Sequence, residues 1–383
     1  MKIYMFPGQG SQFKGMGGSL FDEFSDYTDR ADAILGYSVK TLCLEDPRQE
    51  LGNTQFTQPA LYVVNALTYF KKQKESGVDP DFLIGHSLGE FNALMAAGCF
   101  DFEAGLRLVQ RRGMLMSRMS RGGMAAVINL SKEDIEHTLS SNGLNHLYLA
   151  NYNTPSQIVI SGAQDEIEKA QPLFSADKVR FFPLATSGAF HSPLMHKAME
   201  QFSEVLEGLA FEAPRIPVIA NVTARPYPTD QLTEILSRQI GSTVLWCESV
   251  QYLLALAARR SAEVTFEELG SGDLLTGLVQ AIRAQTPASQ LDGLIEDILP
   301  SAAVEPVPPV VHETAHQTTR QAARQKVDAW NRRYPPGTSV RSTVAGDQTL
   351  ETSSEAVVLF EHRAAVYMEG YNGYFDLDEL MPA

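Results

Sequence analysis

Residues 82–90 read FLIGHSLGE and contain the pattern Gly-x-Ser-x-Gly at positions 85–89. An apolar run that predicts a buried strand comes before this pattern, and a predicted helix follows it, which is the context of a nucleophile elbow. The helix start would offer the Leu88 amide and a positive dipole end to a developing oxyanion. The stretch therefore predicts that Ser87 is a nucleophile, the alternative being an incidental Gly-Ser turn. Lipases, esterases and acyltransferases share such an elbow, so the pattern leaves the reaction open.

The chain around the elbow alternates strands and helices over its first 300 residues, which predicts an α/β fold with a parallel sheet. Residues 3–6 and 82–84 are expected to be buried strands, and residues 59–73, 90–97 and 103–119 helices. Between residues 124 and 184 the expected order is β-α-β-β-α-β, as in a ferredoxin-like unit. We therefore expect a hydrolase-like large subdomain with a ferredoxin-like small subdomain inserted in it.

The composition changes near residue 300, where prolines accumulate and a polar stretch follows. Beyond it, short β-rich runs separated by turn residues predict a small all-β domain that resembles an SH3-like barrel. The predicted domains are the first part of the large subdomain (1–122), the small subdomain (123–187), the second part of the large subdomain (188–299), a linker (300–328) and the β-barrel-like domain (329–383).

The composition excludes several classes of protein. Among 383 residues, 46 are acidic and 31 basic, a net charge of −15 that argues against nucleic acid or an anionic membrane as the main partner. The longest apolar runs are far shorter than the roughly 18–20 residues that span a bilayer. Cys43, Cys99 and Cys247 are odd in number and far apart, which argues against a disulfide scaffold or a cysteine zinc site. We expect a cytoplasmic enzyme without a signal peptide.

Arg112 occupies an unusual place on the helix predicted over residues 103–119. At about 100° per residue, it falls in the apolar arc, whereas Arg107, Arg111 and Arg118 fall on one polar face. A buried guanidinium is costly unless it meets an anion. Two interpretations stay open: an internal salt bridge with Asp or Glu, or a bidentate clamp on a substrate carboxylate.

Six segments occur in an order that resembles the malonyl-CoA:acyl carrier protein transacylase family. They are residues 6–12 (FPGQGSQ), 57–60 (TQPA), 85–90 (GHSLGE), 112–113 (RG), 153–162 (NTPSQIVISG) and 188–192 (GAFHS). The last of them resembles the discrete, trans-acting acyltransferases of polyketide synthases. The resemblance covers about residues 1–295 and leaves the C-terminal part of the chain outside the usual family domain.

The resemblance implies a role for each matching residue. His191, which the fold places at the exit of the inserted subdomain, would be the general base for Ser87 rather than a core or surface histidine. The Gln9 amide would be the second oxyanion donor beside that of Leu88, although Gly8-Gln9-Gly10 alone could be mistaken for part of a dinucleotide fingerprint. The resemblance also implies that Gln239 orients His191. The residues implied to bind the malonyl group are Arg112, Phe190 and Gln58.

The implied reaction is a ping-pong transfer of malonyl from malonyl-CoA, through a Ser87 ester, to the phosphopantetheine thiol of an acyl carrier protein. It needs no metal and no cofactor beyond these substrates. Polyketide synthase modules, or fatty acid synthesis, are the implied context.

Alternatives are an acyl hydrolase that clears carrier proteins, which would tend to lack Arg112, and a docking scaffold that acts through the C-terminal domain. Arg107, Arg111, Arg118 and Arg121 are candidates for docking an acidic carrier protein, against the simpler reading of a solvated helix face.

Overall fold

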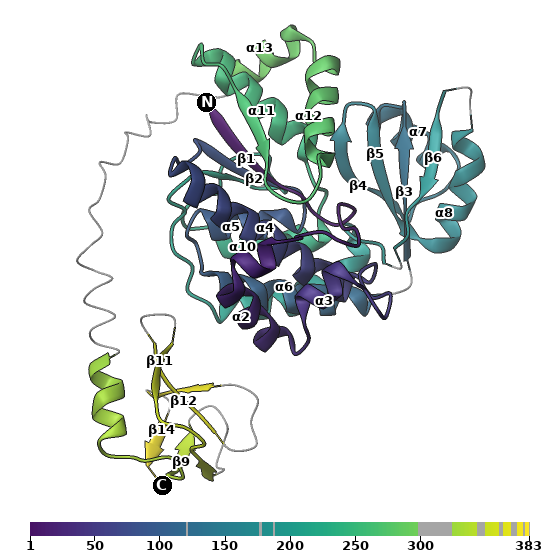
Figure 1. The fold of residues 1–383 in the computed structure, drawn as a ribbon. Coiled ribbons are helices and arrows are strands. Elements are labelled where there is room, and N and C mark those ends of the chain that lie inside the picture. The colour runs from purple at the N-terminus through teal and green to yellow at the C-terminus, as the bar shows by residue number, and fades with distance from the viewer. Residues whose placement is uncertain are drawn as a thin grey trace. The chain divides into compact units, whose positions relative to one another are not determined.

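The protein is seen in a computed structural model that consists of two units, residues 1–299 and residues 300–383 (Figure 1). The structure describes residues 1–119, 122–175, 178–186, 188–297, 324–342, 349–359, 363–368, 374–377 and 380–382. Most of the predicted linker and Arg121 lie outside these residues.

Four parallel strands form the sheet of the first unit, in the order β7-β2-β1-β8. They are β1 (Lys2–Phe6), β2 (Phe82–Gly85), β7 (Val218–Ile219) and β8 (Thr265–Glu268). Phe6 at the end of β1 pairs with Gly85 at the end of β2. The loops that follow these two central strands therefore start side by side, so that the loop of Gln9 begins next to the elbow. The expected α/β class with a parallel sheet is confirmed.

Helices pack on both faces of this sheet because the side chains of a strand alternate between them. Tyr4 and Phe6 enter one hydrophobic core with the first group of helices, whereas Ile3 and Met5 enter a second core with the later group. The helices up to the elbow are α1 (Leu20–Glu23), α2 (Ser25–Leu35), α3 (Val39–Leu44) and α4 (Thr54–Ser76), and α5 (Gly89–Ala96) and α6 (Phe102–Ser117) follow it. Later helices are α9 (His196–Glu207), α10 (Leu232–Arg238), α11 (Trp246–Arg259), α12 (Leu274–Gln285) and α13 (Ala288–Asp297), with short 3-10 turns η2 (Pro193–Met195) and η3 (Gln239–Gly241).

A second, antiparallel sheet lies beside the first and has the strand order β4-β5-β3-β6 (Figure 1). Its elements are β3 (Gly122–Ile128), α7 (Lys132–Ser141), β4 (Leu147–Thr154), β5 (Gln157–Ala163), α8 (Gln164–Ala170), η1 (Gln171–Phe174) and β6 (Arg180–Pro183). Ala125 and Val127 pack under α7 and α8, whereas Met124 and Ala126 belong to the main core. One face of this sheet is therefore part of the large hydrophobic core.

Helix α4 begins earlier than the sequence pattern predicts. The expected start at Pro59 is wrong, because the side chain of Asn53 accepts a hydrogen bond from the Gln55 amide and caps a helix that begins at Thr54. Proline is favoured near a helix start, and this preference suggested a boundary that lies one turn too late. The earlier start places Gln58 within the helix, where it is buried.

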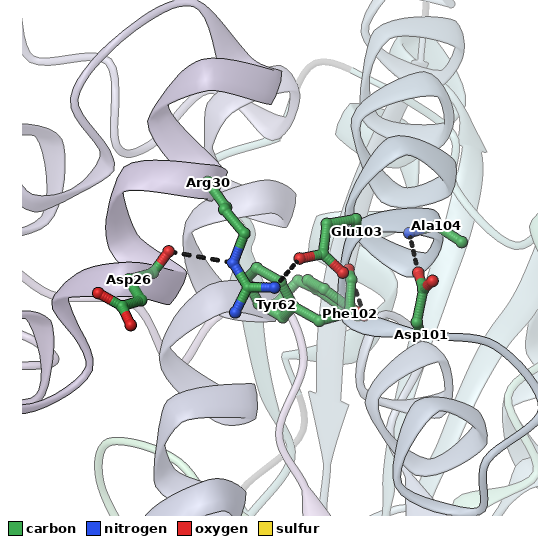
Figure 2. A network of polar contacts seen from close by, with 7 residues as sticks. All are labelled: Asp26, Arg30, Tyr62, Asp101, Phe102, Glu103 and Ala104. Atoms are coloured by element: carbon green, nitrogen blue, oxygen red, sulfur yellow. Dashed lines mark hydrogen bonds and ion pairs between the residues drawn. The ribbon is translucent and has the colours of Figure 1, made fainter. Parts of the chain in front are cut away.

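Helix α6, which carries Arg112, is fixed at its N-terminal end by polar contacts (Figure 2). Asp101 caps the helix by accepting from the Ala104 amide, and Tyr62 of α4 donates to the Phe102 carbonyl. Arg30 of α2 forms an ion pair with Glu103 at 2.5 Å, although burial raises the pKa of that carboxyl. These contacts connect α6 to α2 and α4 and so fix the position of the helix along its axis.

The second unit contains short antiparallel strands in two groups of three, β10-β9-β14 and β11-β12-β13. They are β9 (Ser339–Ser342), β10 (Thr349–Glu351), β11 (Val357–Leu359), β12 (Arg363–Tyr367), β13 (Tyr374–Asp376) and β14 (Leu380–Pro382), and a helix over residues 324–331 precedes them. Val340, Leu350 and Val366 are among the residues of a separate hydrophobic core in this unit.

Because each unit has its own core, we expect a chain that ends at residue 299 to fold without the second unit. Its melting temperature should lie within about 2 °C of that of the corresponding transition in the full chain. Differential scanning calorimetry of both chains measures this. A truncated chain that is insoluble, or that melts much earlier, would show that the second unit stabilises the first.

Candidate active site

Ser87 lies at the turn between β2 and α5 with a left-handed backbone, φ +50°. A non-glycine residue adopts this conformation only where its surroundings hold it there, and such residues cluster at active sites. Here Asn221, just after β7, accepts from the Ser87 amide at 2.7 Å and donates to the Gly85 carbonyl at 2.6 Å. The side chain of one asparagine thus holds both arms of the turn.

Two glycines allow the backbones to approach closely at this turn. A Cβ atom on Gly89 would overlap the carbonyl oxygen of Phe6, and one on Gly8 would overlap the carbonyl oxygen of His86. The glycine of the elbow and that of the loop after β1 are therefore required for the packing of one segment against the other. This packing brings the Gln9 loop against the nucleophile turn.

His191 lies next to Ser87, as the sequence predicts. Its Nε2 atom is 2.7 Å from the Ser87 Oγ, and its Nδ1 atom is 2.9 Å from the main-chain oxygen of Gln239 and 3.1 Å from that of Ser242. Because carbonyl oxygens can only accept, Nδ1 carries the proton and the lone pair of Nε2 faces the serine hydroxyl. The imidazole is thereby oriented to remove a proton from Ser87.

The imidazole is uncharged over the physiological pH range. Burial and the nearby Arg112 guanidinium lower the pKa of His191 to about 3, although the two carbonyls favour the charged form. The surrounding segment is also held firmly: the His191 amide donates to the Ile240 carbonyl, and Val244 exchanges main-chain hydrogen bonds with Ala150 and Tyr152 of β4. The second sheet therefore supports the segment that orients the base.

Arg112 is 1% exposed and lies beside the nucleophile. It donates to the Gln58 Oε1 at 2.7 Å, the Gln239 Oε1 at 2.8 Å and the Ser87 Oγ at 3.2 Å. Within the described residues it forms no ion pair with Asp or Glu, so the internal salt bridge considered above is absent. Burial lowers the pKa of Arg112 to about 10, which leaves it charged at neutral pH. A buried cation with neutral partners beside a nucleophile is suited to bind an anionic group of a substrate.

Glu90, the last residue of the 85–90 segment, is completely buried behind the nucleophile. Its Oε1 atom accepts from the Asn221 amide at 3.0 Å and the Tyr227 hydroxyl at 2.6 Å, and its Oε2 atom accepts from the Gln239 Nε2 at 2.5 Å. Burial raises the pKa of Glu90 to about 7, against the effect of these donors and of Arg112. The sequence analysis assigned this carboxyl no role.

The amides of Gln9 and Leu88 remain candidates for the oxyanion site. Neither N–H donates a hydrogen bond to any residue that the structure describes. Leu88 precedes α5 directly, and the Gln9 side chain accepts from the Thr54 hydroxyl of α4 at 2.8 Å. Two free amides on segments that touch each other are what an oxyanion site requires.

A cleft of about 610 Å³ opens beside this site, although Ser87, His191 and Arg112 are not among the residues that line it. Gln9 and Phe190, which is 6% exposed, contribute to its wall together with residues at the start of α4 and after β6. The cleft is large enough for a small acyl group and part of its carrier. Phe190 directly precedes His191 in the chain, so this part of the cleft wall lies one residue from the base.

The remaining candidates lie at the surface or cannot be placed. Arg107 and Arg118 are exposed and Arg111 is half-buried, so α6 presents a basic face, and whether it docks a partner stays a prediction. In the described part of the chain no group of three His, Cys, Asp or Glu side chains could hold a metal ion. No helix among the described residues is long and apolar enough to span a bilayer.

Sequence reasoning missed the residues that support the site rather than react in it. Asn221, Ser242 and Tyr227 follow Ser87 by more than 130 positions and belong to none of the recognised segments. The assignment of Gln239 covered only its carbonyl, whereas its side chain contacts Arg112, Glu90 and the Ser87 carbonyl. Among the residues that support the site, Glu90 alone lies in a recognised segment, at the end of residues 85–90, and this was the one available signal.

Several known proteins resemble this chain. The model of the acyl transferase domain matches residues 3–300. The polyketide biosynthesis malonyl CoA-acyl carrier protein transacylase PksC of Bacillus subtilis is 52% identical over 75% of this chain and 99% of its own. A crystal structure of a malonyl CoA-acyl carrier protein transacylase from Burkholderia pseudomallei is 60% identical, with a TM-score of 0.75 over 75% of this chain and 99% of that one. A complex of a malonyl-transacylase, PlMCAT, with the type II polyketide synthase carrier protein AntF is 32% identical, with a TM-score of 0.69 over 77% and 99% of the two chains.

The depressed pKa of His191 predicts that Ser87 stays reactive in mild acid. The rate of inactivation by an uncharged sulfonyl fluoride, corrected for the pH dependence of the reagent, should change less than about twofold between pH 8 and pH 5.5. A histidine with the ordinary pKa of about 6.5 would lose about tenfold over this range, because most of it would be protonated. Such a loss would contradict the buried, neutral base. Ser87→Ala is the control for reaction at Ser87, and His191→Ala for dependence on the base.

Proposed function

The chain belongs to the acyl transferase domain family, and we propose on this premise that it is a malonyl-CoA:acyl carrier protein transacylase that works through an ester on Ser87. The observation that carries the proposal is the contact of Ser87 Oγ with both His191 Nε2 at 2.7 Å and the Arg112 guanidinium at 3.2 Å. The first contact supplies a base, and the second a cation for the free carboxylate of a malonyl group. Substrates are malonyl-CoA and a carrier protein, and the reaction needs no further cofactor.

Acylation begins when His191 Nε2 takes the Ser87 hydroxyl proton as Oγ attacks the thioester carbon of malonyl-CoA. The negative charge that forms on the carbonyl oxygen is stabilised by the Gln9 and Leu88 amides. When the tetrahedral intermediate collapses, the carbon–sulfur bond breaks and His191 returns the proton to the sulfur, so that CoA leaves as a thiol. The low pKa of His191 favours this return of the proton.

The second half of the reaction uses the same groups in reverse. His191 takes the proton of the phosphopantetheine thiol, and the sulfur attacks the ester carbon on Ser87. The ester oxygen leaves and recovers the proton from His191, which regenerates the free serine. Because the Gln239 and Ser242 carbonyls hold Nδ1–H throughout, the ring keeps one tautomer through both halves.

Arg112 selects the acyl group. The carboxylate carbon of a malonyl ester lies only three bonds from the Ser87 Oγ, which a guanidinium nitrogen of Arg112 already contacts. A bidentate pair with this carboxylate would satisfy a cation that otherwise has neutral partners. Gln58 fixes the guanidinium from the other side, and Phe190 narrows the cleft in favour of malonyl over methylmalonyl.

The finer assignments remain proposals of ours. The relatives named above support a transacylase that acts in trans, as a separate chain, for polyketide synthase modules and that docks a carrier protein. They favour neither the acyl hydrolase nor the docking scaffold. The strand order β4-β5-β3-β6 with two helices on one face supports a ferredoxin-like small subdomain. The short antiparallel strands of residues 339–382 support a small SH3-like barrel.

Ser87→Ala should form no acyl-enzyme, and His191→Ala should acylate at least about 100-fold more slowly, since a lost general base typically costs this much. Intact-protein mass spectrometry after mixing with malonyl-CoA measures the mass added to the chain. The Ser87→Ala chain should still fold, which circular dichroism checks. Malonyl transfer by this variant at a rate near that of the wild type would contradict the assignment of the nucleophile.

Arg112→Gln tests the choice of substrate. Loss of the charge-assisted pair should lower kcat/KM for malonyl-CoA by about 30- to 1,000-fold, whereas acetyl-CoA, which never used the pair, should keep its rate or gain. The malonyl-to-acetyl preference therefore collapses. The melting temperature should fall by only a few degrees, because no ionised partner is left behind. Equal losses for both substrates with a large drop in melting temperature would instead assign Arg112 a purely structural role.

A further inference from the structure

Four groups of the active site contact one residue, Gln239. Its main-chain oxygen accepts from His191, its Oε1 accepts from Arg112, and its Nε2 donates to the Ser87 carbonyl at 2.7 Å and to Glu90. Both hydrogens of the side-chain amide are therefore used. Glu90 is the one member of this group to which the reaction above assigns no task.

The orientation of the Gln239 amide determines whether Arg112 has an acceptor on this side, in addition to Gln58 and the Ser87 hydroxyl. A guanidinium can only donate, whereas the Ser87 carbonyl and an ionised Glu90 can only accept. If the amide were turned over, its NH₂ group would face Arg112 and its oxygen would face two other oxygens. The Ser87 carbonyl and Glu90, which accept from the NH₂ group of Gln239, thus direct the oxygen of the same amide towards Arg112.

We propose that Glu90 is a positioning residue for substrate selection: by accepting from the Gln239 Nε2, it keeps the Gln239 oxygen on Arg112 and so holds the guanidinium where it meets the malonyl carboxylate. The inference rests on the proposed role of Arg112. Glu90 itself is completely buried behind the turn, and among the described residues its carboxylate contacts only Asn221, Tyr227 and Gln239.

The backbone fixes which way a substituted side chain would turn at this site. In Glu90→Gln the atom facing the Asn221 amide has to be an acceptor, because a main-chain N–H cannot reverse its role. The new NH₂ group would then face the Nε2 of Gln239, donor against donor. Either this pair separates, or the Gln239 amide turns over and presents its NH₂ group to Arg112. In both cases the guanidinium loses the support of Gln239 and is held only by Gln58 and Ser87, without any change in the volume of the side chain at position 90.

The test compares Glu90→Gln with Tyr227→Phe in the full chain at pH 8, where a carboxyl with a pKa of about 7 is mostly ionised. Tyr227→Phe removes a donor to the same carboxylate but leaves the side that faces Gln239 unchanged. For Glu90→Gln we expect kcat/KM for malonyl-CoA to fall about 10- to 100-fold, chiefly through KM, with that for acetyl-CoA within about threefold of wild type. Tyr227→Phe should keep the malonyl-to-acetyl preference within about threefold.

Reactivity with the uncharged sulfonyl fluoride separates the possible failures. A Glu90→Gln chain that keeps this reactivity and loses the malonyl preference supports the proposal. Equal losses for both acyl-CoAs and the reagent, or an unchanged or increased preference for malonyl, would overturn it. Wild-type protein that shows no malonyl preference at all would instead overturn the proposed function.

If Glu90→Gln does not fold, Glu90→Asp provides a second test, because it keeps an acceptor one carbon further away. This variant should reduce the malonyl-to-acetyl preference in part. An unchanged preference in Glu90→Asp would also overturn the proposal.

Discussion

A guanidinium buried to 99% beside a nucleophile has to be supplied with oxygen acceptors, and this requirement organises the centre of the molecule. Arg112 has two glutamine oxygens and the serine hydroxyl, and none of these is charged. Gln58 reaches it from α4 and Gln239 from the turn after α10, so two helices distant in sequence are held at the same point. Neutral acceptors leave the positive charge available, whereas a carboxylate in contact with it would compete with the substrate.

The packing of the nucleophile turn is the second constraint, and it comes from the backbone. The ends of β1 and β2 lie in register, and the glycines at positions 8 and 89 let the two following loops touch. Ser87 and His191 both have positive φ angles, +50° and +56°. Strain of this kind is stable only inside a well-packed frame, which the Asn221 side chain and the segment around residue 240 provide.

The sequence was sufficient for what depends on local patterns. The elbow follows from strand, turn and helix signals, and Arg112 is conspicuous because it breaks the apolar arc of α6. His191 had no local signal of its own and was found through the family resemblance. The roles of Asn221 and Ser242 and the Glu90–Gln239 contact could not be predicted, because they depend on the packing of segments between 51 and 149 residues apart. The start of α4 was misplaced because the cap at Asn53 outweighs the preference of Pro59 for a first turn.

The way in which His191 is oriented has a consequence for how the protein tolerates change over evolution. In a serine hydrolase triad, an acidic side chain orients the imidazole, and a single codon change can delete it. Here two peptide carbonyls do so, and no substitution removes a carbonyl from the chain. Position 242 can therefore accept different side chains as long as the path of the backbone is kept. Inherited variation at that position would leave the acid–base chemistry intact, and selection would act on the shape of the loop rather than on the identity of its residue.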